Sequence, residues 1–173
     1  MQIILMRHAD AGEADPDRWP DDRRRPLTDA GRAEHRRTAA ALRQMGIRFD
    51  RILTSPLVRA RETAEITADI YGGGAPIESE EALGDRGTVA AIMGALARTM
   101  AAAVLCVGHE LLLSRVAARL IGADDRARIR LEKSGIIVVD CDGAPGDGRG
   151  VLCLHLRPRE LAGWLPGPPT AAG

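Results

Sequence analysis

The chain has 173 residues, enough for one domain with a substantial core but too few for two. Its 24 basic and 24 acidic residues give a net charge of zero, so no overall field favours nucleic acid or an anionic membrane as a partner. Aromatic residues make up only 2%, so we expect an aliphatic core. The N-terminal apolar run is far shorter than the ~20 residues of a membrane span, and we expect a soluble, cytoplasmic protein.

Short apolar runs alternate with helical patterns along the chain. In chain order we expect a strand at 2–7, an exposed loop at 9–25, a helix at 29–45, a strand at 50–54, a helix at 57–71, a helix at 88–100, a strand at 103–107, a helix at 111–120, and strands at 136–140 and 151–156. Strands that alternate with helices predict an α/β fold, a three-layer sandwich whose mostly parallel central sheet is flanked by helices.

The C-terminal part of the chain has a different pattern. The last two strands are joined by a turn rich in Gly, Asp and Pro, which predicts a hairpin. We expect residues 1–160 to form a single domain and residues 161–173, which are rich in proline, to form an irregular tail.

Three cysteines, Cys106, Cys141 and Cys153, lie in apolar stretches that are typical of strands. An odd number without a C-x-x-C pair supports neither a disulfide framework nor a zinc site. We expect three buried, reduced thiols, and neither a metal nor a cofactor.

Basic side chains follow the ends of three predicted strands. Arg7 and His8 follow the first strand, Arg59 lies four residues beyond Ser55 at the end of the second, and His109 follows the third. Ligands of open α/β sheets bind outside the carboxyl ends of the strands. These side chains are therefore expected to converge on one phosphate-sized anion.

These residue types fit phosphoryl transfer. A neutral imidazole can attack phosphorus and form a phosphohistidine that water later cleaves. Fixed arginines and a second, protonated histidine stabilise the charge on the transferred group, and the planar fork of arginine binds two phosphate oxygens at once. Each residue alone is also compatible with a structural or surface role, so the residue types by themselves leave both interpretations open.

Four segments resemble a known family. Met6-Arg7-His8-Ala9-Asp10 is similar to the signature of the histidine phosphatase superfamily, also called phosphoglycerate-mutase-like. The segment 25–31, RPLTDAG, resembles the R-P-L-T-x-x-G element of its small phosphohistidine phosphatase (SixA-like) branch. The segment 55–64 is similar to S-P-x-x-R-A-x-x-T-A, and Val107-Gly108-His109 resembles the element that carries the second histidine.

The resemblance implies roles for individual residues. His8 is the expected nucleophile, and Arg7, Arg59 and His109 are expected to form the phosphate pocket. Arg25 is an expected phosphate or substrate contact, its alternative being a charged loop end beside two further arginines. The resemblance is weaker past residue 120, apart from Ser134-Gly135, which is expected to border the pocket.

Two departures from the family pattern matter. Ala9 stands where the wider superfamily commonly has glycine, and its methyl group restricts φ. The general acid of the larger members has no clear counterpart, and both Glu81 and Asp85 are candidates. An ester leaves as an alkoxide and needs a proton, whereas a phosphohistidine leaves as imidazole and needs a weak acid or none.

Larger members carry a cap of additional helices where this chain has only a linker and one expected helix, between Tyr71 and Ala103. An open site suits a folded protein as substrate. The favoured function is a metal-independent phosphatase of protein phosphohistidine, with a histidine phosphotransfer domain as partner. The alternatives are a phosphatase of a sugar, nucleotide or cofactor phosphate, and a non-catalytic phosphate-binding module. A mutase is the least favoured, because it normally needs a capped site that excludes water.

Overall fold

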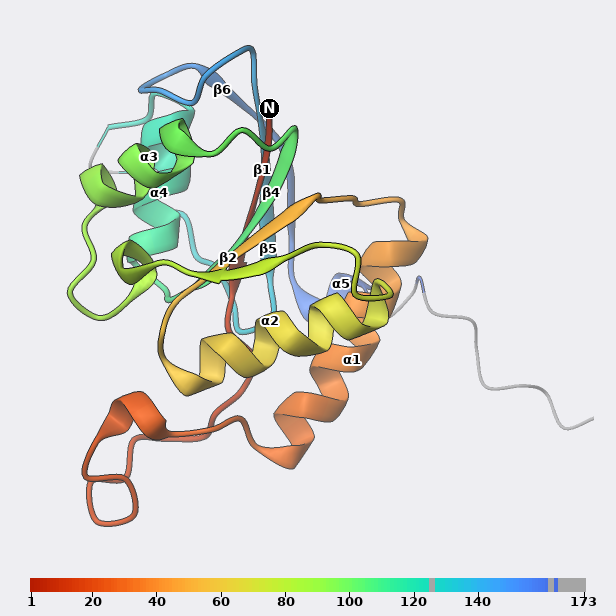
Figure 1. Cartoon of the computed structure of the whole chain (residues 1–173), viewed down its shortest axis with the longest axis vertical. Helices are drawn as coiled ribbons and strands as arrows, with labels where there is room; N and C mark the ends of the chain where they lie inside the picture. Colours follow the sequence, from red (N-terminus) through yellow and green to blue (C-terminus); the bar gives the residue numbers. More distant parts are fainter. Residues whose placement is uncertain (125–126, 162–163, 165–173) are drawn as a thin grey trace, which may run out of the picture.

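The computed structural model describes residues 1–124, 127–161 and 164 (Figure 1). Its elements in chain order are β1 (Gln2–Arg7), η1 (Asp22–Arg24), α1 (Asp29–Gln44), β2 (Arg51–Thr54), α2 (Val58–Ile70), β3 (Ile77–Ser79), η2 (Glu81–Leu83), α3 (Val89–Arg98), β4 (Ala103–Gly108), α4 (Leu112–Leu120), β5 (Ile136–Cys141), β6 (Gly150–Leu156) and α5 (Pro158–Leu161). Every strand and helix that the sequence predicts is present, with ends displaced by no more than one or two residues.

The six strands form one sheet in the order β3-β2-β4-β1-β5-β6. The pairs β3–β2, β2–β4 and β4–β1 are parallel, whereas β1–β5 and β5–β6 are antiparallel. The expected hairpin is therefore the antiparallel half of a mixed sheet. The short edge strand β3 was not predicted, because its three exposed residues carry no apolar alternation.

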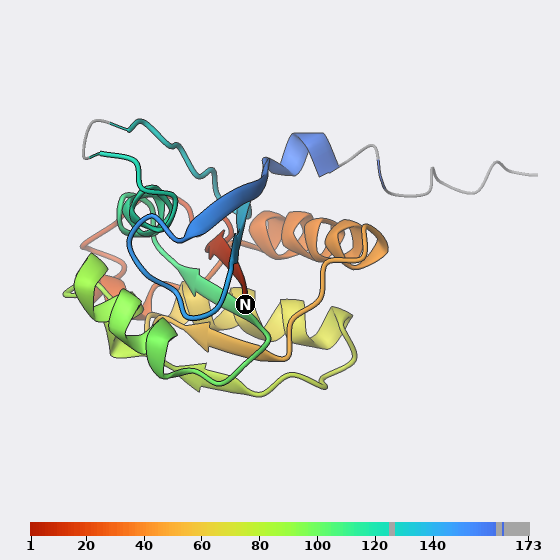
Figure 2. The ribbon, with the colours of Figure 1, turned by 90° about the horizontal axis from the view of Figure 1, so that it is seen from above.

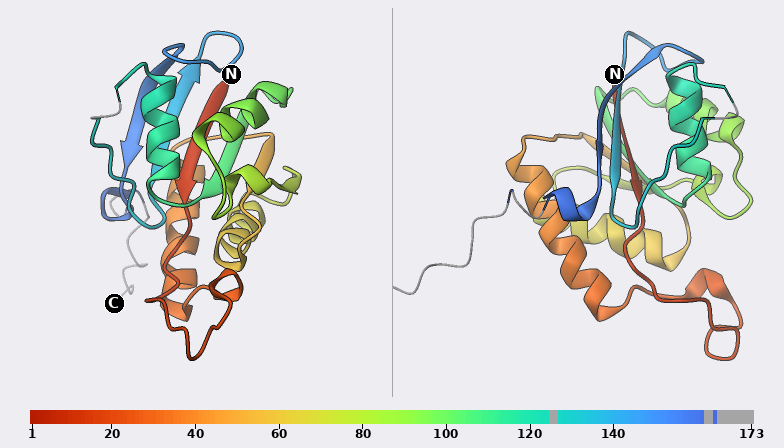
Figure 3. Two further views of the ribbon diagram at one scale, coloured as in Figure 1. Left: turned by 90° about the vertical axis from the view of Figure 1, so that its left-hand side faces the viewer. Right: turned by 180° about the vertical axis from the view of Figure 1, so that it is seen from behind.

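Helices cover both faces of the sheet, as expected for a three-layer sandwich. Figures 2 and 3 show α1 and α2 on one face and α3 and α4 on the other. Ile3 and Leu5 of the central strand β1 pack with α3 and α4, and the alternating Ile4 and Met6 pack with α1 and α2. This arrangement follows from the two-residue period of a strand, which directs successive side chains to opposite faces.

The thiols do not all lie in the core. Cys106 and Cys141 are buried as expected, but Cys153 is exposed, so the prediction for that residue is wrong. Cys153 lies on the edge strand β6, whose side chains are mostly exposed or half-buried. An apolar stretch on an edge strand resembles a buried strand in sequence, and only the position in the sheet distinguishes the two.

The end of the expected domain and the first residue of the expected tail form a short helix. Residues 158–161 form the short helix α5, and Leu161 is buried in the cluster that includes α1. Most of the expected tail, residues 162–163 and 165–173, lies outside the described residues. Within the part of the chain that is described, no helix is long and apolar enough to cross a membrane.

Candidate active site

The three strands that were expected to carry site residues end side by side. Arg7 pairs with Gly108, and Thr54 pairs with Val107, so the carboxyl ends of β1, β4 and β2 are level. Two backbone hydrogen bonds continue this register into the loops: the amide of His8 donates to the carbonyl of Gly108, and the amide of Ser55 donates to the carbonyl of Val107, both at 2.9 Å. The ends of three strands are thereby fixed around one small volume.

Two imidazoles meet in this volume. The ring centroids of His8 and His109 are 5.1 Å apart with the rings at 60° to each other. The Nε2 atom of His109 lies 3.0 Å from the hydroxyl of Ser55. The His8 side chain is buried, and residue 109 is half-buried. The structure therefore brings the two predicted histidines into contact.

The hydrogen bond of His8 defines its tautomer. Its Nδ1 atom is 2.7 Å from the carbonyl oxygen of Ala9, and because a carbonyl only accepts, Nδ1 carries the proton when the ring is neutral. Burial lowers the pKa of His8 from 6.5 to about 3, with the carbonyl of Ala9 opposing the shift and the neighbouring cations contributing to it. At neutral pH, His8 therefore presents an unprotonated Nε2 with a free electron pair.

His109 is neutral in the ligand-free protein. Burial, followed by the positive charge of Arg59, lowers the pKa of His109 to about 4, although the Asp85 carboxylate acts in the opposite direction. The expectation of a protonated second histidine concerns the site with a bound phosphoryl group and stays a prediction. Without a bound anion, a cation at this position would be desolvated beside two arginines.

The two predicted arginines are held in the same way. Nη1 of Arg7 donates to the carbonyl of Leu131 at 3.1 Å, and Nη1 of Arg59 donates to the carbonyl of Asp22 at 2.9 Å. The Nε atoms of both arginines are buried and have no hydrogen-bond partner among the described residues. Buried donors are nearly always paired in folded proteins, so these two are available to an anion.

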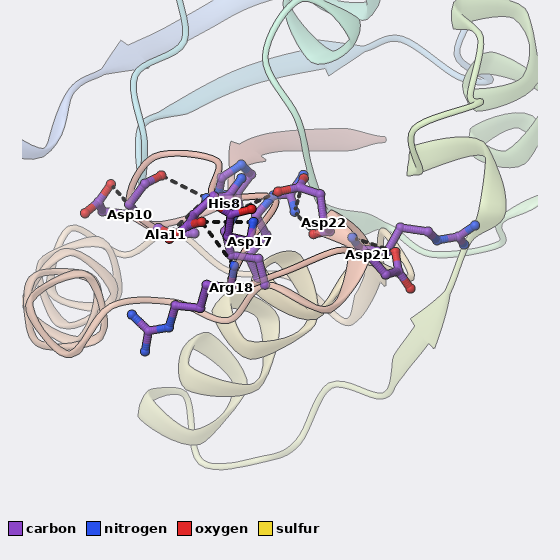
Figure 4. A network of polar contacts seen from close by, with 12 residues as sticks. His8, Asp10, Ala11, Asp17, Arg18, Asp21 and Asp22 are labelled. Carbon is purple, nitrogen blue, oxygen red and sulfur yellow. Dashed lines mark hydrogen bonds and ion pairs between the residues drawn. The ribbon is translucent and has the colours of Figure 1, made fainter.

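Arg25 lies beside these residues and bonds to the loop that contains it. Its Nε donates to the Asp22 carboxylate at 2.7 Å, and its Nη1 donates to the carbonyls of Ala11 and Gly12, both at 2.8 Å. Figure 4 shows this loop network close to His8. Arg25 is buried, and the role expected for it as a phosphate or substrate contact stays a prediction.

The family-like motifs have a local explanation. The amide of Ala9 donates to the hydroxyl of Thr63 on α2, and its φ is not positive, so this position does not require glycine. The hydroxyl of Thr28 accepts from the amide of Gly31 and caps α1. A Cβ atom on Gly31 would lie 2.2 Å from the carbonyl oxygen of Asp10, so the close approach of α1 to the segment after His8 requires glycine there.

The two candidate acids differ in their surroundings. The negative charge of Asp85 partly opposes the lowering of the pKa of His109 and of Arg59, which indicates that its carboxylate lies near the site. Glu81 begins the turn η2 and lines a shallow depression together with residues of α3, such as Ala91. Asp85 is therefore the better placed of the two.

Sequence reasoning missed three polar residues at the site. Ser55 contacts His109, Thr63 holds the backbone after His8, and Asp22 contacts Arg59. Ser55 and Thr63 lie inside the segment 55–64 that was compared with the family, and that segment was the signal for them. Asp22 stands in a loop with many acidic and basic residues and carries no comparable signal.

Ser134-Gly135 borders the site, as expected. The amide of Ser134 donates to the carbonyls of Arg7 and His8 at 3.1 and 3.3 Å, and the amide of Arg7 donates to the carbonyl of Gly135 at 3.2 Å. Ser134 has a φ of +60°, which is unusual for a residue other than glycine. Across the described ranges, no cluster of three or more His, Cys, Asp or Glu side chains has a geometry that could hold a metal ion.

Comparison with known proteins agrees with this geometry. The family model of the histidine phosphatase superfamily (branch 1) matches residues 3–90. The phosphohistidine phosphatase SixA of Escherichia coli is 35% identical over 124 residues, which cover 69% of this chain and 74% of that protein. An uncharacterized protein of Picosynechococcus is 36% identical over 140 residues, which cover 79% of this chain and 83% of that protein.

A solved structure shares the whole fold. The protein histidine phosphatase SixA complexed with tungstate superposes with a TM-score of 0.79 at 29% identity, covering 93% of this chain and 99% of that one.

Proposed function

The chain belongs to the histidine phosphatase superfamily, and on that premise we propose that it hydrolyses protein phosphohistidine through a covalent intermediate on His8. The observation that carries the proposal is a neutral imidazole beside two guanidinium groups whose buried Nε atoms have no protein partner among the described residues. The imidazole is the nucleophile, and the guanidinium groups are the anion site. The SixA relatives, which are named as phosphohistidine phosphatases, support the substrate class.

The proposed reaction has two steps. In the first step the electron pair of His8 Nε2 forms a bond to phosphorus, and the bond from phosphorus to the substrate nitrogen breaks, its electron pair leaving with the imidazole. The positive charge that develops on the His8 ring is stabilised by the hydrogen bond from Nδ1 to Ala9. In the second step water attacks the phosphohistidine, and inorganic phosphate leaves His8 unprotonated at Nε2 again.

The arginines and the second histidine act on the transferred group. Arg7 and Arg59 donate to its oxygens, which share charge in the transition state. A bound phosphate dianion supplies negative charge beside His109 and favours its protonated form, which the ligand-free site disfavours. Fixed donors of this kind cost little reorganisation during the reaction.

The surroundings of the site favour a protein substrate. Between α2 and β4 the described chain contains the edge strand β3, the turn η2 and the helix α3, and α3 packs in the core cluster on one face of the sheet. No further helix of this segment covers the ends of β1 and β4. A phosphohistidine on the surface of a folded domain, such as a histidine phosphotransfer domain, can approach such a site.

A small phosphate ester is the second candidate, and one observation favours it. Asp85 places a carboxyl group near His109 and Arg59, and in its protonated form this group would donate the proton that an alkoxide leaving group needs. A non-catalytic binding module is less favoured, because a phosphate binder has no need of a neutral, buried imidazole as nucleophile.

The decisive experiment compares substrates in one assay. A phosphorylated histidine phosphotransfer domain, p-nitrophenyl phosphate and a sugar phosphate are each tested for kcat/KM, with and without EDTA. We expect the phosphoprotein to have the highest kcat/KM and the chelator to have no effect. A higher value for the sugar phosphate would favour the ester phosphatase, and loss of activity in EDTA that zinc or magnesium restores would contradict the metal-independent reaction.

A further inference from the structure

We propose that Asp22, on the long loop after β1, is a positioning residue that orients Arg59 toward the phosphate, an inference that rests on the proposed function. Asp22 opens the short turn η1, which begins 14 residues after His8 in sequence yet contacts the first turn of α2. The loop is thus part of the site.

Asp22 holds one end of the guanidinium of Arg59. Its carbonyl accepts from Nη1 at 2.9 Å, and its Oδ2 atom lies 3.2 Å from the same nitrogen. The opposite edge of a guanidinium, formed by Nε and Nη2, is one of the edges that bind two oxygens of a phosphate. Because Nε of Arg59 is buried and unpartnered among the described residues, the contacts of Asp22 leave this edge for the ligand.

The side chain of Asp22 is itself held in place by Arg25. Its Oδ1 atom accepts from Nε of Arg25 at 2.7 Å, and Nη1 of Arg25 is bound to the carbonyls of Ala11 and Gly12. The preceding Asp21 caps η1 by accepting from a backbone amide. The hydrogen bond from Arg25 lowers the pKa of the Asp22 carboxyl, so it remains ionised. A continuous chain of contacts therefore runs from the loop backbone through Arg25 and Asp22 to Arg59.

This arrangement also assigns Arg25 a part. Its Nε donates to the Asp22 carboxylate, so Arg25 supports Arg59 through Asp22. The opposite interpretation is that the Asp22 carboxylate is an internal anion that competes with phosphate for Arg59. The two interpretations predict opposite signs: removing a positioning residue weakens anion binding, whereas removing a competitor strengthens it.

The test measures tungstate binding by calorimetry, which does not depend on turnover. Without the Asp22 carboxylate, the Arg59 side chain must be ordered when the anion binds, which costs conformational entropy. We therefore expect Asp22→Ala to weaken tungstate binding by roughly threefold to tenfold. Asp17→Ala removes an exposed carboxylate of the same loop and is the matched control, expected to bind like wild type. Asp22→Asn keeps a hydrogen-bond acceptor and the shape of the side chain, so we expect its affinity for tungstate to lie between those of Asp22→Ala and wild type. It replaces the alanine variant if that variant does not fold.

A double-mutant cycle separates positioning from a general effect on the loop. If Asp22 acts through Arg59, Asp22→Ala has no further effect on tungstate binding in an Arg59→Ala background. The proposal is overturned by tighter or unchanged binding in the single variant, or by an equal loss in both backgrounds. If the wild-type protein does not bind tungstate, the phosphate site and with it the proposed function are contradicted. If wild type binds tungstate but the double-mutant cycle shows no coupling between Asp22 and Arg59, only the role of Asp22 is contradicted.

Discussion

The imidazole of His35 lies 3.1 Å from the hydroxyl of Ser134, which is 99 residues further along the chain. Its other ring nitrogen, Nε2, lies 2.9 Å from the hydroxyl of Thr67. Because the Thr67 hydroxyl donates its own proton to the backbone carbonyl of Thr63, it can only accept from His35. Nε2 of His35 is therefore the donor, and Nδ1 accepts from Ser134. The amide of Ser134 in turn donates to the carbonyls of Arg7 and His8. A buried, neutral histidine of α1 therefore supports the end of β1, where the proposed nucleophile His8 lies.

The first prediction concerns this histidine and pH. Burial lowers the pKa of His35 from 6.5 to about 4. Between pH 6.5 and about pH 4, this histidine is therefore protonated in the unfolded chain but neutral in the folded protein. The free energy of unfolding falls as the pH falls through this window, and this group contributes a loss of roughly 3 kcal/mol. Urea unfolding of wild type and His35→Asn between pH 7.5 and pH 4 measures the effect, and we expect a shallower loss in the variant.

His155→Asn is the control for this experiment, because residue 155 is exposed on β6. It is expected to retain the wild-type dependence of stability on pH. At pH 7.5, His35→Asn should also be less stable by about 1–3 kcal/mol, because it leaves buried polar partners unsatisfied. Equal pH slopes in wild type and His35→Asn would show that His35 is not buried in its neutral form.

The second prediction concerns the nucleophile. His8→Ala should abolish turnover, because its neutral Nε2 is the proposed attacking atom. Brief incubation of wild type with a phosphorylated substrate, followed by quenching and peptide mapping, should show an acid-labile phosphohistidine at residue 8. More than a trace of activity in His8→Ala, or a phosphoryl group found on His109 instead, would contradict the proposed intermediate.

The third prediction compares two neighbouring arginines of α2. Two residues apart on a helix, Arg59 and Arg61 point about 200° from each other. The Arg59 side chain is only 9% exposed and contacts Asp22, whereas Arg61 is exposed. Arg59→Ala should lower kcat/KM by roughly a hundredfold to a thousandfold, equivalent to about 3–4 kcal/mol, and Arg61→Ala by no more than a few-fold.

Arg59→Lys extends the comparison. A lysine retains the charge but lacks the planar fork, so we expect it to restore little activity. Steady-state kinetics of the three variants on one substrate provide the measurement. Similar losses at both positions, or full activity in Arg59→Lys, would show that charge alone matters and that the orientation of the guanidinium does not.

The fourth prediction separates the candidate acids by substrate. Asp85→Asn should slow hydrolysis of p-nitrophenyl phosphate less than hydrolysis of a sugar phosphate, because a poorer leaving group depends more strongly on a proton donor. It should leave hydrolysis of protein phosphohistidine within a few-fold of wild type. Glu81→Gln, the matched control, should leave all three rates unchanged, and an inverted pattern would assign the acid to Glu81.

Local patterns in the sequence determined much of this protein. Apolar alternation and helical periodicity depend on neighbouring residues only, and they placed every strand and helix apart from β3, the turns η1 and η2 and the short helix α5. The motif around Arg7 and His8 and the segment 55–64 identified the nucleophile candidate and the second arginine. These segments are informative because a strand that ends in Arg-His places both residues at its carboxyl end, where ligands of open α/β sheets bind.

The tertiary structure decided what depends on burial and on partners distant in sequence. The neutral state of His109 follows from its desolvation beside Arg59, and the exposure of Cys153 follows from the edge position of β6. The contact of Asp22 with Arg59 joins a charged loop to a helix 37 residues away. Burial and such contacts are set by how the elements pack, and no pattern of neighbouring residues encodes them.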